Sequence, residues 1–153
     1  MLFRSDVAGY TVTASDGTTV VSETGTTDSL SVVLLAQPFG DVVFNVTSSD
    51  GTEASVGSAT LVFDNSNWSV AQFVVVSGED DNLIDGTQTP SITLSVAQDA
   101  TDNLFDSMAD EVRQVSVTSD DAPGFTVVES GDATSVTERS EEHTLNSSHV
   151  RTS

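Results

Sequence analysis

Apolar and polar residues alternate in short runs along almost the whole chain. Every second residue is apolar in Leu30-Val32-Leu34, Val42-Phe44-Val46 and Ile92-Leu94-Val96. A period of two places successive side chains on opposite faces of a β-strand, so that one face can be buried. Glycine, aspartate and asparagine separate the runs, as is typical of turns. The sequence therefore predicts a fold made of strands only.

The number and spacing of these runs indicate a particular all-β architecture. Seven strands in one unit of about 115 residues are typical of an immunoglobulin-like antiparallel β-sandwich. Trp68 precedes one run, and we expect it to cap the edge of the core. The expected strands are 9–14 together with 18–22, then 29–36, 41–48, 58–64, 70–77, 90–98 and 112–119.

The start of the chain is repeated 115 residues later. Gly9-Tyr10-Thr11-Val12 aligns without a gap with Gly124-Phe125-Thr126-Val127, and further identities follow at the same offset. A repeat of this length is a whole domain rather than one turn of a solenoid. We therefore expect residues 6–122 to form one complete repeat and 123–138 to form the first strand of the next. The neighbouring repeats of a tandem array are then the expected partners, which points to a stalk, spacer or adhesive module.

The two ends of the chain do not fit the repeat. Leu-Phe-Arg-Ser at residues 2–5 can be encoded by CTC TTC CGA TCT, whose reverse complement encodes Arg-Ser-Glu-Glu, the sequence of residues 139–142. Such an inverted repeat resembles sequencing-library adapter read as protein. We interpret residues 1–5 and 139–153 as artefact, expect 139–153 to be disordered, and leave both out of the structural argument.

The charge balance excludes several classes of partner. The chain has 24 acidic and 4 basic residues and a net charge of −20, and Arg113 is the only basic residue between Asp6 and Glu138. Binding to nucleic acid or to an anionic membrane needs clustered Lys and Arg, which this chain lacks.

No apolar run approaches the roughly 20 residues needed to span a bilayer. The absence of cysteine excludes disulfides.

Acidic residues concentrate in the loops expected at one end of the sandwich. Successive connections between antiparallel strands alternate between its two ends, which we name the near pole, where the first strand begins, and the far pole. The far pole then holds loops 23–28, 49–57 and 78–89 and the exit segment 120–122. These segments contain ten carboxylates: Glu23, Asp28, Asp50, Glu53, Glu79, Asp80, Asp81, Asp85, Asp120 and Asp121.

Ten carboxylates at one pole predict a bound cation, because they repel one another strongly if left bare. Calcium accepts about 6–8 oxygen ligands from flexible loops, whereas magnesium demands octahedral geometry and zinc prefers Cys and His. We interpret the acidic near-pole loop 99–106 as solvated, because it lacks the glycine and terminal glutamate of an EF-hand.

Four motifs in order resemble a known family. They are Val21-Ser22-Glu23, Asp50-Gly51-Thr52, the acidic run from Gly78 to Gly86, and Ser119-Asp120-Asp121-Ala122. This pattern resembles the Calx-beta repeat, in the version found in tandem in large bacterial surface and secreted proteins, and it covers about 9–124.

The resemblance implies calcium binding at the far pole, beside the junction with the following repeat. Asn82 and Gln88 stand where the animal calcium sensors of the family have acidic residues, which implies fewer ions or weaker binding. The expected location is extracellular or on a bacterial cell surface, where calcium would stiffen the junction between repeats. Carried over by position, the ligands are Glu23, Asp50, Asp81, Asp85, Asp120 and Asp121, with Asp80 as a further candidate.

Three other functions would each have a recognisable signature in the sequence or the fold. Catalysis is not expected, because no histidine lies between residues 6 and 138 and no phosphate loop or nucleophile elbow is present. A module that binds a cell-surface ligand, carbohydrate or ice would display a threonine or aromatic platform on one sheet face. The threonines here mostly alternate with core valines on short strands, which is the usual pattern of a solvent face. A calcium-independent spacer would have far-pole loops that are merely solvated.

Overall fold

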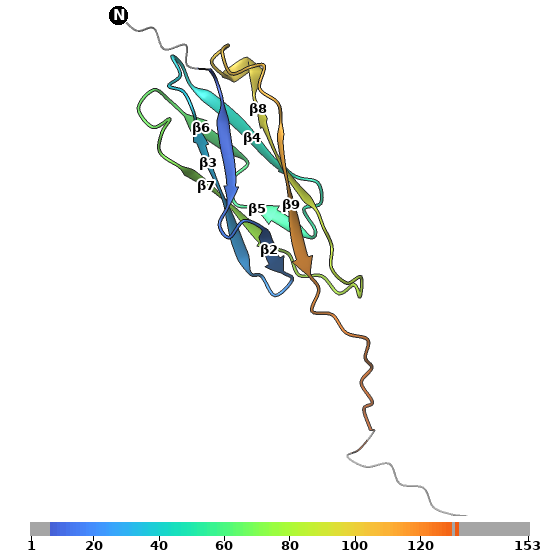
Figure 1. The fold of residues 1–153 in the computed structure, drawn as a ribbon. Coiled ribbons are helices and arrows are strands. Elements are labelled where there is room, and N and C mark those ends of the chain that lie inside the picture. Colours follow the sequence, from blue (N-terminus) through green and yellow to red (C-terminus); the bar gives the residue numbers. More distant parts are fainter. Residues whose placement is uncertain (1–6, 130, 132–153) are drawn as a thin grey trace, which may run out of the picture. The chain divides into compact units, whose positions relative to one another are not determined.

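The computed structural model describes residues 7–129 and 131 and contains two packed β-sheets. One sheet has the strand order β1-β3-β7-β5 and the other β2-β9-β8-β4-β6 (Figure 1). The predicted β-sandwich class is confirmed. The strands are β1 (Tyr10–Ala14), β2 (Thr19–Ser22), β3 (Thr27–Leu34), β4 (Val42–Ser48), β5 (Ala54–Val56), β6 (Thr60–Phe63), β7 (Gln72–Gly78), β8 (Ser91–Val96) and β9 (Glu111–Thr118).

The core lies between the two sheets and is built from the alternating positions. Leu30 and Val32 of β3, Phe44 of β4 and Leu94 of β8 are fully buried. Trp68 is partly buried against this core, as expected of a residue at its edge. Phe105 is also buried, and it lies in the long near-pole loop that follows the 3₁₀ helix η1 (Gln98–Ala100). Burial of alternate apolar side chains, at about 25 cal/mol per Å² of apolar area, favours this layered arrangement.

Two features of the strand arrangement differ from the sequence prediction. β2 pairs with β9 in parallel, so the expectation of purely antiparallel strands is wrong at this pair. The physical reason is that the first strand is interrupted at Gly17, where φ is 84°, and its two halves join different sheets. β5 was not predicted, because its three residues are too short to show an alternating pattern; it pairs with β7, whereas β6 pairs with β4.

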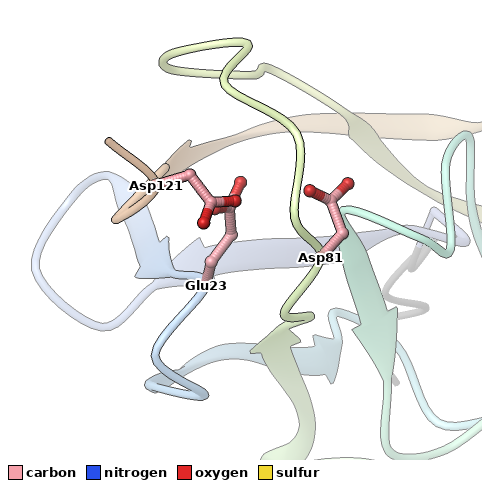
Figure 2. A group of neighbouring side chains, drawn as sticks. All are labelled: Glu23, Asp81 and Asp121. Carbon is pink, nitrogen blue, oxygen red and sulfur yellow. The ribbon is translucent and has the colours of Figure 1, made fainter. Parts of the chain in front are cut away.

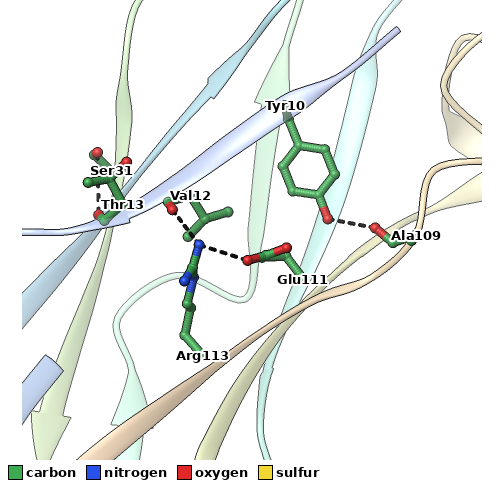
Figure 3. A network of polar contacts seen from close by, with 7 residues as sticks. All are labelled: Tyr10, Val12, Thr13, Ser31, Ala109, Glu111 and Arg113. Atoms are coloured by element: carbon green, nitrogen blue, oxygen red, sulfur yellow. Dashed lines mark hydrogen bonds and ion pairs between the residues drawn. The ribbon is translucent and has the colours of Figure 1, made fainter. Parts of the chain in front are cut away.

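Side-chain contacts hold β1 near β9, where no backbone pairing does. The Tyr10 hydroxyl donates to the carbonyl oxygen of Ala109 at 2.8 Å. The Arg113 guanidinium donates to the carbonyl oxygen of Val12 at 2.7 Å and pairs with Glu111 at 2.7 Å (Figure 3). The only lysine or arginine of the described residues is thus engaged on the side of the sandwich, between the two sheets.

The first compact unit ends at Ala122, and a second begins at Pro123. Residues 123–129 form no strand, and Phe125 is 91% exposed. The strand expected over 123–138 otherwise lies outside the described residues and stays a prediction. The same is true of the interpretation of 1–5 and 139–153. No helix in residues 7–129 is long and apolar enough to cross a membrane.

Candidate metal centre

Three carboxylates from distant parts of the sequence meet at the far pole. Glu23 follows β2, Asp81 lies in the loop between β7 and β8, and Asp121 lies just after β9. Their side chains turn toward one another (Figure 2). One oxygen from each lies within 4.8 Å of the other two. Two oxygens that bind one calcium ion at 2.3–2.6 Å lie at most about 5 Å apart, so this spacing fits such an ion.

A second group of carboxylates adjoins the first. Glu53, Asp81 and Asp85 also bring one oxygen each to within 4.8 Å of one another. Asp81 belongs to both groups and therefore lies between Glu23 and Asp121 on one side and Glu53 and Asp85 on the other. The far pole thus offers two adjoining sets of acidic oxygens that share one residue.

Two of these carboxylates are buried. Glu23 is 1% exposed and Glu53 is 8% exposed, and they are the buried acidic side chains of the described residues. Glu23 Oε1, Glu53 Oε2 and Asp121 Oδ2 have neither solvent nor a hydrogen-bond partner. Burying a carboxylate oxygen without a partner is costly, because the charge loses its hydration. Three such oxygens within two groups indicate that the site suits a bound cation.

Backbone hydrogen bonds hold the acidic side chains in place. The backbone N–H of Glu23 donates to the carbonyl of Thr118 at 3.1 Å, which fixes the end of β2 against the end of β9. Glu23 Oε2 accepts the backbone N–H of Asp120 at 3.3 Å. Asp81 Oδ1 accepts the backbone N–H of Leu83 at 2.6 Å. Each of these two side chains therefore has one oxygen engaged with the backbone and a second that can face an ion.

The close approach of two backbones brings Glu23 to this position. A Cβ atom on Gly78 would lie 2.1 Å from the carbonyl oxygen of Ser22, so only glycine fits at the end of β7. The backbone N–H of Gly78 donates to the carbonyl of Thr26 at 3.0 Å. β7 therefore runs directly against the turn that begins at Glu23.

The electrostatic environment of the site favours protons or other cations. Burial raises the pKa of Glu53, and the nearby carboxylates of Asp85 and Asp81 raise it further. Burial likewise raises the pKa of Asp121, and the negative charges of Asp120 and Asp81 add to this effect. The one arginine of the described residues pairs with Glu111, so it does not offset this negative charge.

Three of the ligand positions expected from the sequence lie outside both groups. Oδ1 of Asp50 accepts the backbone N–H of Thr52 at 3.0 Å and its hydroxyl at 2.6 Å, which organises the turn after β4. Asp80 and Asp120 line a cavity of about 400 Å³ together with Glu79 and with Glu23, which also belongs to the first group. The residues that follow them in sequence, Asp81 and Asp121, belong to the first group, with Glu23.

Glu53 is a far-pole carboxylate that the sequence did not single out as a candidate ligand, and the structure places it in the second group. Its backbone carbonyl accepts the N–H of Glu79 at 2.9 Å, and it directly precedes the buried Ala54 of β5. The signal for Glu53 is β5, which starts at the next residue and pairs with β7. The residue just before such a strand lies against the loop that follows β7 and carries Asp81 and Asp85.

The near-pole acidic loop has a structural role that the sequence did not reveal. Asp102 Oδ2 accepts backbone N–H groups from Phe39 at 2.7 Å and Gly40 at 3.0 Å, and its Oδ1 accepts that of Leu104 at 3.0 Å. These bonds lower the pKa of Asp102, the bond from Leu104 most strongly. The loop expected to be solvated is therefore organised around this carboxylate.

Comparison with known proteins adds to the description of the fold. No family profile matches the sequence, and no curated protein is similar to it. The E. coli chaperone DraB has a similar structure, with a TM-score of 0.51, at 8% identity over 77% of this chain and 59% of the chaperone chain. At this identity the likeness shows the fold alone.

Two further solved structures are similar at lower TM-scores. The apo-form Calx CBD1 domain has a TM-score of 0.46 at 16% identity, over 73% of this chain and 98% of that domain. SSP-19, an MSP-domain protein like family member in Caenorhabditis elegans, has a TM-score of 0.45 at 18% identity, over 70% and 97%. Together, the fold and the site describe a β-sandwich with a group of acidic oxygens at its far pole that could hold a metal ion.

Proposed function

We propose that this chain is a calcium-binding structural repeat and that the ion binds at its far pole. The observation that carries the proposal is the set of buried, unpartnered oxygens on Glu23, Glu53 and Asp121, grouped around Asp81. A divalent cation among them replaces the lost hydration and cancels the repulsion between the carboxylates. Glu23, Asp81 and Asp121 would hold one ion, and Glu53 and Asp85 would complete the ligands on the other side of Asp81.

The chemistry of the donor set favours calcium over other metals. All the grouped ligands are carboxylates, and no histidine or cysteine lies within residues 7–129. Zinc and softer metals prefer nitrogen and sulfur ligands. Glu23, Asp81 and Asp121 come from three separate segments, which suits the flexible geometry of calcium better than the strict octahedron of magnesium.

The position of Asp121 relates the ion to the architecture of a tandem array. Asp121 belongs to the segment through which the chain leaves the compact unit at Ala122. An ion bound to Asp121 and Glu23 would fix this exit segment to the end of β2 and to the loop between β7 and β8. We propose that calcium thereby stiffens the junction with a following repeat, in an adhesin or surface-protein stalk outside the cell. Extracellular calcium-binding modules commonly have Kd values of about 10⁻⁴–10⁻³ M.

Thermal unfolding of the full 153-residue chain tests the metal site. The Tm would be measured in EDTA and across a calcium series, with magnesium as the control cation. A ligand that binds only the folded state stabilises it by about 2.7 kcal/mol at 100 times its Kd, or about 10 °C for a domain of this size. We expect a rise of this order with calcium and a clearly smaller one with magnesium. Equal Tm values in EDTA and calcium would instead identify a calcium-independent spacer.

A further inference from the structure

The outer face of the four-stranded sheet has an uncharged surface rich in hydroxyl groups. We name it the hydroxyl face and define it by the outward residues of β1, β3 and β7. These are Thr11, Thr13, Thr27, Ser29, Ser31, Val33, Phe73, Val75 and Ser77. None is charged, in a chain with 24 acidic residues. The acidic side chains lie mainly in the loops at the two poles, so the hydroxyl face is set apart from them.

One row of this face combines an aromatic ring with two hydroxyl groups. Strand register places Thr13 opposite Ser31, and Ser31 opposite Phe73, so the three residues form one line across β1, β3 and β7. Phe73 is 59% exposed, whereas its neighbour in the strand, Val74, is fully buried. The hydroxyl of Ser31 points to the carbonyl of Thr13, as Figure 3 shows. Phe73 therefore presents its ring to solvent beside Ser31 and Thr13.

The size of the hydroxyl face argues against a stable protein partner. Neighbouring strands lie about 4.8 Å apart and alternate residues of one strand about 6.7 Å apart, so a face of three strands measures about 10 by 20 Å, or about 200 Å². A stable protein–protein interface buries about 800 Å² on each partner. Such a face is large enough for a few rings of a small or chain-like ligand.

The chemistry of the face selects the class of ligand. Strong negative charge elsewhere on the molecule repels anionic ligands, and no cation on the face would attract them. A sugar ring has an apolar C–H face that packs on an aromatic ring, and hydroxyls that exchange hydrogen bonds with Ser and Thr. We propose that the hydroxyl face binds a neutral polysaccharide, with one sugar ring against Phe73 and its hydroxyls toward Ser31 and Thr13.

The opposite face of the sandwich supplies a matched control. Val62 of β6 lies on the outer face of the five-stranded sheet and is 45% exposed. The outward residues of that sheet's strands include no aromatic side chain. A substitution at Val62 therefore removes exposed apolar surface from a sheet face without touching an aromatic ring.

The experiment measures binding of the full chain to microcrystalline cellulose, chitin and soluble β-1,3-glucan, with alginate as the anionic control. We expect binding to at least one neutral polysaccharide and none to alginate. Phe73→Ser should weaken that binding at least tenfold, the double variant Thr13→Ala/Ser31→Ala should weaken it less, and Phe73→Tyr and Val62→Ala should bind as the parent does. Circular dichroism and Tm would show that each variant is folded.

Several outcomes would overturn the proposal. They are no binding to any of the neutral polysaccharides, unchanged binding by Phe73→Ser, or equal loss in Phe73→Ser and Val62→Ala. Self-association that depends on Phe73 would identify a second copy of the chain as the occupant instead. Repeating the measurement in EDTA, at a temperature where the chain is folded, separates this proposal from the calcium site, because the hydroxyl face uses none of the far-pole carboxylates.

Discussion

Glu23 accepts a hydrogen bond from the backbone of Asp120, with 3.3 Å between Oε2 and the amide nitrogen. The bond joins the end of β2 to the segment that leaves β9, although 97 residues separate them in sequence. The second oxygen of Glu23 is buried and without a partner. One side chain therefore both fixes the exit of the chain and offers a ligand to the candidate ion.

Replacing Glu23 should abolish the response to calcium. Glu23→Gln keeps the shape and an oxygen that can accept the Asp120 N–H, but it removes the buried negative charge. We expect the Tm in EDTA to stay the same or rise, since an uncompensated buried charge is lost, and the rise with calcium to disappear. Asp16→Ser is the control, because Asp16 is an exposed turn residue between β1 and β2. Calcium stabilisation of Glu23→Gln equal to that of the parent would remove Glu23 from the site.

Asp81 should contribute more to calcium binding than any residue that belongs to one group alone. Asp81→Asn takes a charge from both sets of oxygens, whereas Asp85→Asn affects only the set with Glu53. Isothermal titration calorimetry with calcium should give a larger loss of affinity, or fewer ions bound, for Asp81→Asn than for Asp85→Asn. Equal effects of the two substitutions would contradict the shared position of Asp81.

The contribution of Glu53 to the stability of the metal-free protein should fall as the pH rises. The pKa of Glu53 is raised by burial and by Asp85 and Asp81, so the folded state binds this proton more tightly than the unfolded state. Between the unfolded pKa of about 4.3 and the higher folded pKa, stability due to Glu53 falls as pH rises. In EDTA, Glu53→Gln should therefore lose less stability than the parent when the pH is raised from 4 to 7.

The same raised pKa values predict competition between protons and calcium. Glu53 and Asp121 must be deprotonated to bind the ion, and both hold their protons more tightly than usual. The difference in Tm between calcium and EDTA should shrink as the pH is lowered from 7 toward 4.5. A calcium effect of the same size at both pH values would place the ion away from these two residues.

Gly78 should tolerate no side chain. In Gly78→Ala the new Cβ would lie 2.1 Å from the carbonyl oxygen of Ser22, so β7 and the turn at Glu23 would have to separate. We expect a loss of about 1–3 kcal/mol in the free energy of unfolding and a weaker response to calcium. Gly57→Ala is the matched control, because its Cβ would meet the Val75 side chain at an ordinary 3.5 Å. Urea unfolding of both variants, with and without calcium, measures the difference.

The regular part of the fold could be predicted from the sequence because burial and strand period coincide there. Leu30, Val32, Phe44 and Leu94 alternate with polar residues and are all buried. The parallel pairing of β2 with β9 could not be predicted, because alternation reports which face of a strand is buried and not which strand lies beside it. The three residues of β5 are too few for any period to be recognised.

The candidate site could be predicted as a region but not as a set of contacts. Alternation of the connections between two poles was enough to bring Glu23, Asp81 and Asp121 to one end. The sequence could not show that Asp81 and Asp121 join the grouped carboxylates, whereas Asp80 and Asp120 line the cavity beside Glu23. Nor could it show that Asp50 is engaged with Thr52, because such contacts depend on the local path of each loop.

The parallel pairing of β2 with β9 has a mechanical consequence. Four residue pairs, from Thr19–Val115 to Ser22–Thr118, join the beginning and the end of the sandwich side by side and in the same direction. The chain enters this unit at one pole and leaves it at the other (Figure 1). Tension that is transmitted through β1 to β2, and applied directly to β9, pulls the paired strands along their length in opposite directions. The hydrogen bonds between them are then loaded in shear and share the force, instead of breaking one after another.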